Sequence, residues 1–271
     1  SSVETVIWVS LLLTGLGWGA VEAASNPMVA ALYPEEKTHR LNILHAWWPA
    51  GIVVGGLMGH TLTRVGLPWE LNMFVLLLPA LALAWMVSRA TFPVTERVAA
   101  GVSYGQMFSE LLKRPLFWVF WVCMFFTATA ELAPGQWVNI ALSHIVGMQG
   151  ILLLVYVSAL MFVMRHFAGP IVAHISPIGL MFVSCLAAGI GLYLLSLADT
   201  PALAFASATV LGLGVCYRWP TTLLITSERL PLGPPTALGL MLLAGGLAIT
   251  SVFPQLCAIF TTAQPHSPLG A

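Results

Sequence analysis

The sequence predicts an all-α membrane protein with about eight transmembrane helices, and three observations lead to that prediction. Of its 271 residues, 59% are hydrophobic and 7% are charged, against about 25% charged in an ordinary soluble domain. Apolar stretches long enough to cross a bilayer recur along the whole chain. Basic residues gather in alternate gaps between these stretches. A chain this apolar cannot cover itself with a polar surface, which excludes a soluble fold.

The predicted spans and the loops between them define an orientation. The spans are at 5–32, 41–63, 68–88, 116–141, 148–167, 176–197, 201–226 and 236–260. Eight of the ten Lys and Arg residues lie in or beside the connections 33–40, 89–115, 168–175 and 227–235. Because cytoplasmic loops are enriched in Lys and Arg, we expect these four connections inside and both chain ends outside. We expect a multi-pass protein of the inner, cell membrane.

Charge, cysteines and motif spacing argue against other classes of protein. Ten acidic and ten basic residues balance, and no basic cluster predicts a nucleic-acid partner. No HExxH or comparable ligand spacing occurs, so we expect no metal, no cofactor and no enzymatic activity. A membrane-embedded enzyme would need a nucleophile–base pair or metal ligands at one depth. Each cysteine stands alone in an apolar run, as reduced packing residues do: Cys123, Cys185, Cys216 and Cys257.

An internal echo predicts how the spans are organised. GLGWGAVEAASNPMVAALYPEE from Gly15 is echoed by GLGVCYRWPTTLLITSERLPL from Gly212, at an offset of 197 residues and six spans. Such a period fits a transporter with two six-helix halves related by an axis along the membrane normal. The chain also begins almost directly in a span without an initiator Met. We therefore expect a piece of a longer chain, the alternative being a processed eight-helix protein.

The long connection separates the two sets of spans. It carries an amphipathic helix candidate, which suits a linker lying along the cytoplasmic surface, with one face formed by Tyr104, Phe108, Leu111 and Leu112. The predicted parts are residues 1–88 (three spans of the first bundle), 89–115 (the linker) and 116–271 (five spans of the second bundle).

Glu22 is the first polar residue to explain, because a carboxylate at membrane depth costs about 3 kcal/mol even on lenient scales. Asn26 lies one helical turn further along the same predicted span. A proton-coupled carrier needs a carboxylate whose proton affinity changes with its surroundings. Glu22 is therefore the candidate for proton coupling. The alternative is a fixed, hydrogen-bonded or ion-paired residue.

Polar and aromatic residues in four spans are candidates for solute recognition, because planar polar groups bond hydroxyl pairs and aromatic faces pack on a sugar ring. The substrate-binding candidates are Asn26, Asn42, His45, Trp48, Glu131, Gln136, Trp137, Asn139, Arg218 and Trp219.

Each of these candidates has a competing interpretation. Trp47 and Trp48 are equally compatible with an interfacial aromatic belt, and Gln136 and Asn139 with an outer helix cap. His45 has three alternatives: shuttling protons, donating to a hydroxyl, or bonding a neighbouring carbonyl. Pro134 and Gly135 predict a break in their span, of the kind tolerated where backbone lines a cavity.

Arg218 is the cation that falls inside a span. It either pairs with Glu22 or Glu131, which we favour, or snorkels to the cytoplasmic face.

Three stretches of the chain resemble the major facilitator superfamily, and within it the fucose-permease-like sugar:proton symporters. The first reads GxGxGxxExxxNP and continues to LNxxHAWWPxG; the second is ELAPGQWV from Glu131; the third combines RHFAGPIVAHISP from Arg165 with RWPTTLLITSERLP from Arg218. The resemblance implies spans four to eleven of twelve. It also implies that 5–32, 116–141 and 201–226 line a central cavity, with the fourth wall, the family's first helix, absent.

The resemblance also implies roles for individual residues. Glu22 would take up and release a proton in step with sugar binding. Arg165 and Gly169 match the superfamily's loop motif, which implies gating through cytoplasmic ion pairs and helix-end contacts. His166 and His174 stand where the family often has further basic residues, which weakens the match.

The function predicted from these observations is proton-coupled uptake of a monosaccharide-like solute by alternating access. The expected partners are that solute, the proton and the lipid bilayer, with a monomeric full-length protein. One alternative keeps the fold and changes the cargo to another small solute or a drug, which an apolar cavity would favour. The other is a truncated fragment or receptor that does not transport.

Overall fold

The computed structural model of the chain describes residues 2–68, 70–92, 101, 103–145, 150–230 and 234–263. Within these ranges the regular structure consists of ten helices. They are α1 (Ser2–Leu32), α2 (Lys37–Val65), α3 (Glu70–Arg89), α5 (Tyr104–Leu112), α6 (Pro115–Ile145), α7 (Gly150–Arg165), α8 (Ala168–Ser196), α9 (Pro201–Val215), α10 (Arg218–Arg229) and α11 (Pro234–Ala263).

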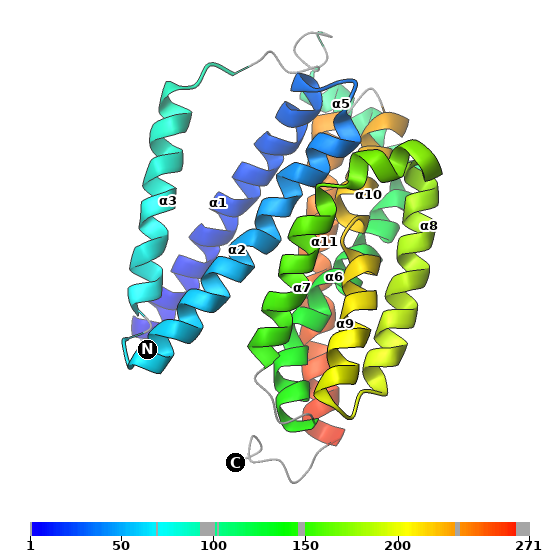
Figure 1. The fold of residues 1–271 in the computed structure, drawn as a ribbon. Coiled ribbons are helices and arrows are strands. Elements are labelled where there is room, and N and C mark those ends of the chain that lie inside the picture. Colours follow the sequence, from blue (N-terminus) through cyan, green and yellow to red (C-terminus); the bar gives the residue numbers. More distant parts are fainter. Residues whose placement is uncertain are drawn as a thin grey trace.

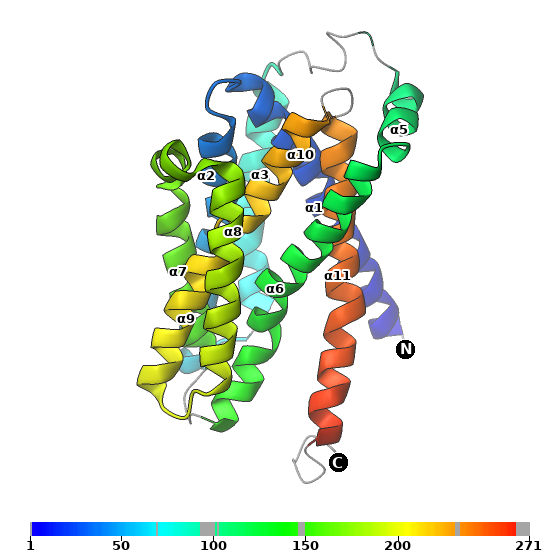
Figure 2. The same cartoon turned by 90° about the vertical axis from the view of Figure 1, so that its right-hand side faces the viewer.

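The helices form two neighbouring groups, α1–α3 and α6–α11, which meet along α2 and α7 and along α1 and α11 (Figures 1 and 2). In Figure 1, α1 begins and α11 ends at the lower end of the molecule. The turn between α1 and α2, the turn between α7 and α8, and the ends of α3 and α10 lie at the upper end. The connections predicted to be cytoplasmic thus gather at one end.

All eight predicted spans correspond to apolar helices. Five segments of the described chain are long and apolar enough to cross a membrane: Glu4–Leu32, Lys37–Val65, Pro115–Leu132, Ala168–Ser196 and Pro201–Arg229. Shorter apolar helices occupy Met73–Arg89, Ile151–Arg165 and Ala237–Ser251. The predicted helical membrane fold is therefore confirmed, and the helix ends differ from the predicted boundaries by a few residues.

The breaks in the helices are not where the sequence predicts them. The Pro-Gly pair at 134–135 lies inside the continuous α6, so the expected break there is wrong. The last-but-one span is broken instead, because α9 ends at Val215 and α10 begins at Arg218. Such a break leaves backbone carbonyls in the interior without helical partners.

The predicted connection 168–175 is also helical, because α8 starts at Ala168 and kinks at Ser176. Ser176 has φ 60° and ψ 161°, a left-handed conformation that is strained for a residue with a side chain. Pro177 explains the kink, since the residue before a proline is disfavoured in the helical region. The Ser176 hydroxyl then accepts the N–H of Gly179 at 3.2 Å, which caps the continuing helix.

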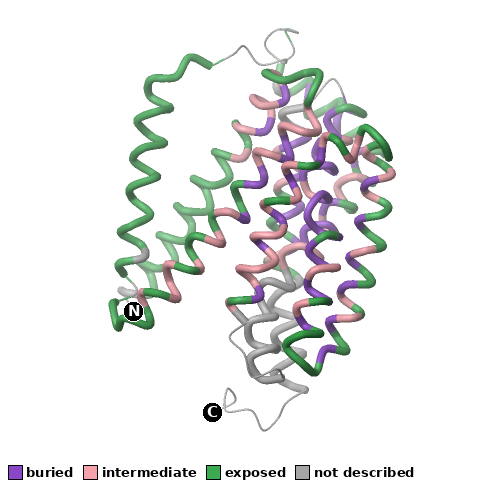
Figure 3. Tube along the Cα trace, viewed as in Figure 1, coloured by how far each residue is buried: buried purple, intermediate pink, exposed green. Residues whose placement is uncertain are grey.

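Two apolar clusters hold the α6–α11 group together. One joins α7, α8 and α9 around Leu153, Leu211 and Val215, and the other joins α6, α10 and α11 around Phe117 and Met241. Figure 3 shows buried positions concentrated in this group, while α1 and α3 are mostly exposed. Exposed apolar side chains are expected where a helix faces lipid.

Small residues allow α8 and α9 to pack closely. A Cβ atom added to Gly191 would overlap the backbone of Leu211, and one added to Gly214 would overlap the backbone of Ala188. Close helix approach through small residues is a main source of packing energy in membranes, where burial from water no longer drives association.

The linker helix α5 packs through a different face from the predicted one. Met107 and Leu111 are buried, whereas Phe108 and Leu112 are exposed. Ser103 and Gln106 form a reciprocal capping box at its start. Of the predicted face, Leu111 contacts the bundle, and the side chain of Tyr104 lies outside the described residues.

Candidate functional site

The contact between α1 and α2 is made by a chain of polar side chains. Asn26 Nδ2 donates to Glu22 Oε2 at 2.9 Å and to the Glu22 carbonyl oxygen at 2.8 Å. His45 Nε2 lies 2.8 Å from Asn26 Oδ1, where the ring N–H donates to the amide oxygen. Asn26 and His45 are buried and Glu22 is half-buried. The i, i+4 spacing of Glu22 and Asn26 thus produces the shared face that the sequence predicts.

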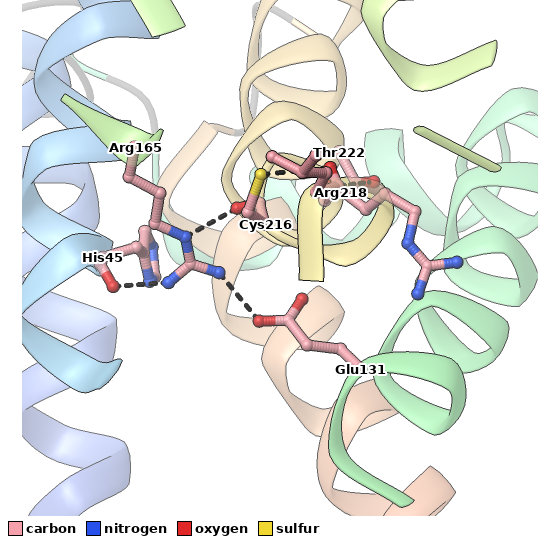
Figure 4. Close-up of polar contacts among 7 residues, drawn as sticks. His45, Glu131, Arg165, Cys216, Arg218 and Thr222 are labelled. Atoms are coloured by element: carbon pink, nitrogen blue, oxygen red, sulfur yellow. Dashed lines mark hydrogen bonds and ion pairs between the residues drawn. The ribbon is translucent and has the colours of Figure 1, made fainter. Parts of the chain in front are cut away.

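Arg165, in the last turn of α7, is bonded on three sides (Figure 4). Its Nη2 contacts Glu131 Oε1 on α6 at 2.7 Å, and its Nε donates to the Cys216 carbonyl oxygen at 2.6 Å. Its Nη1 donates to the carbonyl oxygen of His45 on α2. A buried ion pair needs such additional hydrogen bonds to offset the loss of hydration. This arginine therefore ties α2, α6 and the broken span together.

The break between α9 and α10 is what supplies one of these acceptors. Cys216 and Tyr217 form the turn between the two helices, and the Cys216 carbonyl points to Arg165 instead of continuing a helix. The Tyr217 hydroxyl donates to the Met164 carbonyl oxygen at 2.7 Å. Both contacts attach the broken span to the end of α7.

Arg218 does not form the ion pair that the sequence favours. It is 6% exposed, and its Nε and Nη2 have no hydrogen-bond partner among the described residues. Glu131 is paired with Arg165 and Glu22 is bonded to Asn26. In Figure 4 the Arg218 guanidinium lies across Glu131 from Arg165, and its positive charge acts on the same carboxyl. The prediction that Arg218 pairs with Glu22 or Glu131 is therefore wrong. Arg165, which the sequence predicts at the cytoplasmic end of its span, forms the ion pair with Glu131 instead.

Two adjoining cavities lie beside these side chains. The smaller, of about 30 Å³, is lined by Glu22, His45, Glu131 and Arg165 together with Trp18, Trp48, Trp219 and Leu132. The larger, of about 280 Å³, lies among α2, α6, α7 and α9, with Leu195 of α8. Trp48, Glu131 and Leu132 belong to both walls. The site is thus polar and aromatic at one end and apolar at the other.

The structure brings together several of the residues predicted to bind solute. Four of them line the smaller cavity: His45, Trp48, Glu131 and Trp219. Glu22, the predicted proton-coupling residue, and Arg165, the predicted gating residue, line it as well, and Asn26 bonds to both Glu22 and His45. Trp48 stacks on Trp18, with ring centroids 5.0 Å apart. Trp47 is 65% exposed, as expected of an aromatic-belt residue.

Other predicted residues lie elsewhere. Asn42 is fully buried and its Nδ2 donates to the Thr38 carbonyl oxygen at 2.8 Å, away from the residues that line the cavities. Gly169 on α8 lies against the ring of His39 on α2, because a Cβ atom added to Gly169 would be 3.0 Å from the nearest ring atoms. This close contact joins α8 to α2. The side chains of Gln136, Trp137 and Asn139 lie outside the described residues.

Sequence reasoning missed Trp18 and the apolar cavity. Trp18 precedes Glu22 by one helical turn, and this spacing could have placed it on the same face. The cavity wall combines residues from five helices, and no single segment of the sequence carries a signal for it. Among the described residues, no group of three or more His, Cys, Asp and Glu side chains is arranged to hold a metal.

Comparison with known proteins places this arrangement in a family. The family model described as the Major Facilitator Superfamily matches residues 1–252. The crystal structure of the E. coli fucose:proton symporter FucP, solved as a point variant, matches with a TM-score of 0.70 and 16% sequence identity. The match covers 96% of this chain and 72% of that chain. No curated protein matches the sequence. With eight apolar helices arranged as in that fold and a family match over most of its length, this multi-pass membrane protein belongs to the major facilitator superfamily.

Proposed function

We propose that this secondary transporter couples the uptake of a monosaccharide-like solute to a proton by alternating access. The observation that carries the proposal is the half-buried Glu22, bonded to Asn26 on the wall of a small cavity with three tryptophans. A proton-coupled carrier needs a carboxyl group that water reaches in one state and that is enclosed in the other, and the wall of a cavity offers such a position. The similarity of the fold to that of FucP, a fucose:proton symporter, supports the proposal.

Solute recognition is proposed for the residues at the polar end of the site. Trp48 and Trp219 offer aromatic faces there, and Glu131 and His45 offer hydrogen-bonding groups. Arg165 is proposed to gate transport, because it joins α2 to the α6–α11 group through His45 and Glu131. Movement of one group against the other requires this arginine to release at least one of its three acceptors.

The two groups of helices, α1–α3 and α6–α11, are proposed to belong to the two halves that move relative to each other during alternating access. On this proposal the linker region 89–115 lies at the cytoplasmic surface, and the full-length protein works as a monomer in the inner membrane. Gly169, which packs on His39, is proposed to hold the cytoplasmic ends of α8 and α2 together in one of the two states.

The test is a measurement of proton movement in vesicles that contain the protein. Fucose is the first solute, and external alkalinisation on its addition reports proton uptake. Glu22→Gln is expected to abolish the alkalinisation while counterflow exchange of labelled solute continues. Glu35→Gln is the matched control, because Glu35 is an exposed acid in the turn that follows the same helix. Unchanged proton uptake in Glu22→Gln would show that Glu22 is structural.

A less polar cargo is the second candidate, and one observation favours it. The larger cavity has a wall made mostly of aliphatic side chains. If fucose and other monosaccharides fail to move protons while an amphipathic solute does so, the transport proposal stands with a different cargo.

A further inference from the structure

The larger cavity has the size of a ligand site. Its volume of about 280 Å³ is nearly twice that of an apolar cavity of ~150 Å³ that binds benzene and stays dry when empty. A bicyclic aromatic molecule therefore fits in it. Aliphatic residues from five helices form most of the wall, among them Ile52, Leu153, Leu211 and Val215.

One end of this cavity offers a hydrogen-bond acceptor that nothing in the described protein uses. Glu131 is on the wall, and its Oε2 is buried and without a partner, whereas its Oε1 is bonded to Arg165. A buried carboxylate oxygen without a donor is unfavourable, and a hydroxyl group from a ligand would satisfy it. Ser158 is the other hydroxyl or acidic side chain on the wall.

The charges around Glu131 decide which donor suits it. Arg165 already neutralises the carboxylate, and the positive charge of Arg218 acts on it as well. An ammonium group would add a third positive charge beside one negative charge. A neutral hydroxyl donates the hydrogen bond without that repulsion.

We propose that the larger cavity binds the apolar body of the cargo and that a hydroxyl group of the cargo donates to Glu131 Oε2. The substrate class is a neutral amphipathic alcohol about the size of a two-ring aromatic molecule. This inference rests on the proposed transport function and favours its second candidate, the less polar cargo, over a monosaccharide. A bare monosaccharide fits less well, because hydroxyl groups all round its ring would face leucine, isoleucine and valine side chains that offer them no partner.

The first experiment compares three probes in the unmodified full chain. 2-Naphthylmethanol and 2-ethylnaphthalene have nearly the same size and differ by the hydroxyl group, and 2-naphthylmethanol's methyl ether keeps the oxygen but loses the donor. Equilibrium dialysis into protein-loaded nanodiscs, corrected with empty nanodiscs, measures the binding of each. The alcohol is expected to bind about tenfold or more tightly than the other two, because both lack the hydrogen bond to a charged group. Equal affinities would overturn the proposal.

Two substitutions of alanine by leucine in α9 test whether the alcohol occupies the cavity. Ala208 is buried and lines it, so Ala208→Leu is expected to weaken binding of the alcohol by about tenfold or more. Ala206→Leu adds the same atoms at an exposed position of the same helix and is expected to bind as the wild type does. Undiminished binding by a folded Ala208→Leu protein would overturn the proposal. The comparison of the three probes decides the question if that variant does not fold.

Failure of this inference differs from failure of proton coupling. Nanodisc binding requires no proton movement, so selective binding of the alcohol supports the inference even if Glu22→Gln shows no effect on transport. If fucose drives proton uptake and 2-naphthylmethanol does not inhibit it, transport stands and the assigned cargo class falls.

Discussion

The first transmembrane segment and the broken segment of α9 and α10 are matched in length and nearly matched in hydropathy, yet their environments differ. Both comprise 29 residues, but none of the most apolar part of Glu4–Leu32 is buried, against 56% of that of Pro201–Arg229. Both segments carry glycines, but the buried segment also has a row of buried polar side chains, including Arg218, Thr222 and Thr226. Hydropathy and glycine content alone therefore do not decide which segment lies inside the molecule, whereas the polar side chains mark the buried one.

The same difference separates the two groups of helices. The α6–α11 group is held by apolar clusters, close glycine contacts and the bonds of Arg165. α1 contacts α2 through the hydrogen bond between Asn26 and His45 and the stacking of Trp18 on Trp48. Equivalent substitutions should therefore have larger effects in the α6–α11 group than in the α1–α3 group, and two pairs of variants test this. A third pair, within α1, measures the contact between α1 and α2.

The largest effect is expected at Arg165. Arg165→Met leaves Glu131 as an unpaired buried charge and frees two carbonyl groups, so we expect a loss of about 3–5 kcal/mol in the free energy of unfolding. Unfolding in SDS, followed by circular dichroism, measures it. Arg64→Met is the control, because Arg64 is exposed in the last turn of α2. The double variant Arg165→Met/Glu131→Met should recover part of the loss, and a double variant less stable than the single one would contradict this account.

A smaller effect is expected for adding a methyl group to a glycine. Gly214→Ala forces α9 away from the backbone of Ala188, which should cost about 1–3 kcal/mol. Gly15→Ala in α1 meets nothing within 4 Å and should be neutral or stabilise by up to about 1 kcal/mol through helix propensity. Opposite shifts of the SDS midpoint would sharpen the contrast between the two groups. Equal shifts in the two variants would contradict the expected difference between the two groups of helices.

The smallest effect is expected at the aromatic contact between α1 and α2. Trp18→Ala removes the stack on Trp48, which should cost about 0.5–1.5 kcal/mol beyond the loss of lipid contact. Trp8→Ala, at a position that is 72% exposed on the same helix, is the matched control. The difference between the two SDS midpoints isolates the stack, and no difference would mean that lipid replaces the ring without loss.

Features that depend on one segment could be predicted from the sequence. The spans follow from long apolar runs, and the arrangement of the basic connections at one end follows from their alternation. The bond between Glu22 and Asn26 follows from helical spacing. The linker helix was also predicted, although its buried face turned out to be that of Met107 and Leu111.

Features that depend on the packing of distant segments could not be predicted. Pro134 and Pro220 both lie inside predicted spans, and each lacks the N–H that would bond the carbonyl four residues earlier. The helix α6 continues through Pro134, whereas the other span turns at Cys216 and Tyr217 just before Pro220, so the packed structure decides which proline breaks its span. Glu131 and Arg165 are 34 residues apart on different helices, so their pairing depends on how α6 meets α7. Two arginines compete for one carboxylate, and only the packed structure decides between them.

The acceptor that α2 offers to Arg165 is a peptide oxygen rather than a side chain. Every amino acid at position 45 carries that oxygen, so alanine scanning of α2 leaves this link to α7 in place and reports only the loss of the imidazole contact to Asn26. A substitution at position 45 therefore removes the imidazole ring but keeps the carbonyl group. Replacing the amide between residues 45 and 46 by an ester, which makes the carbonyl a poorer acceptor and keeps every side chain, addresses the link itself.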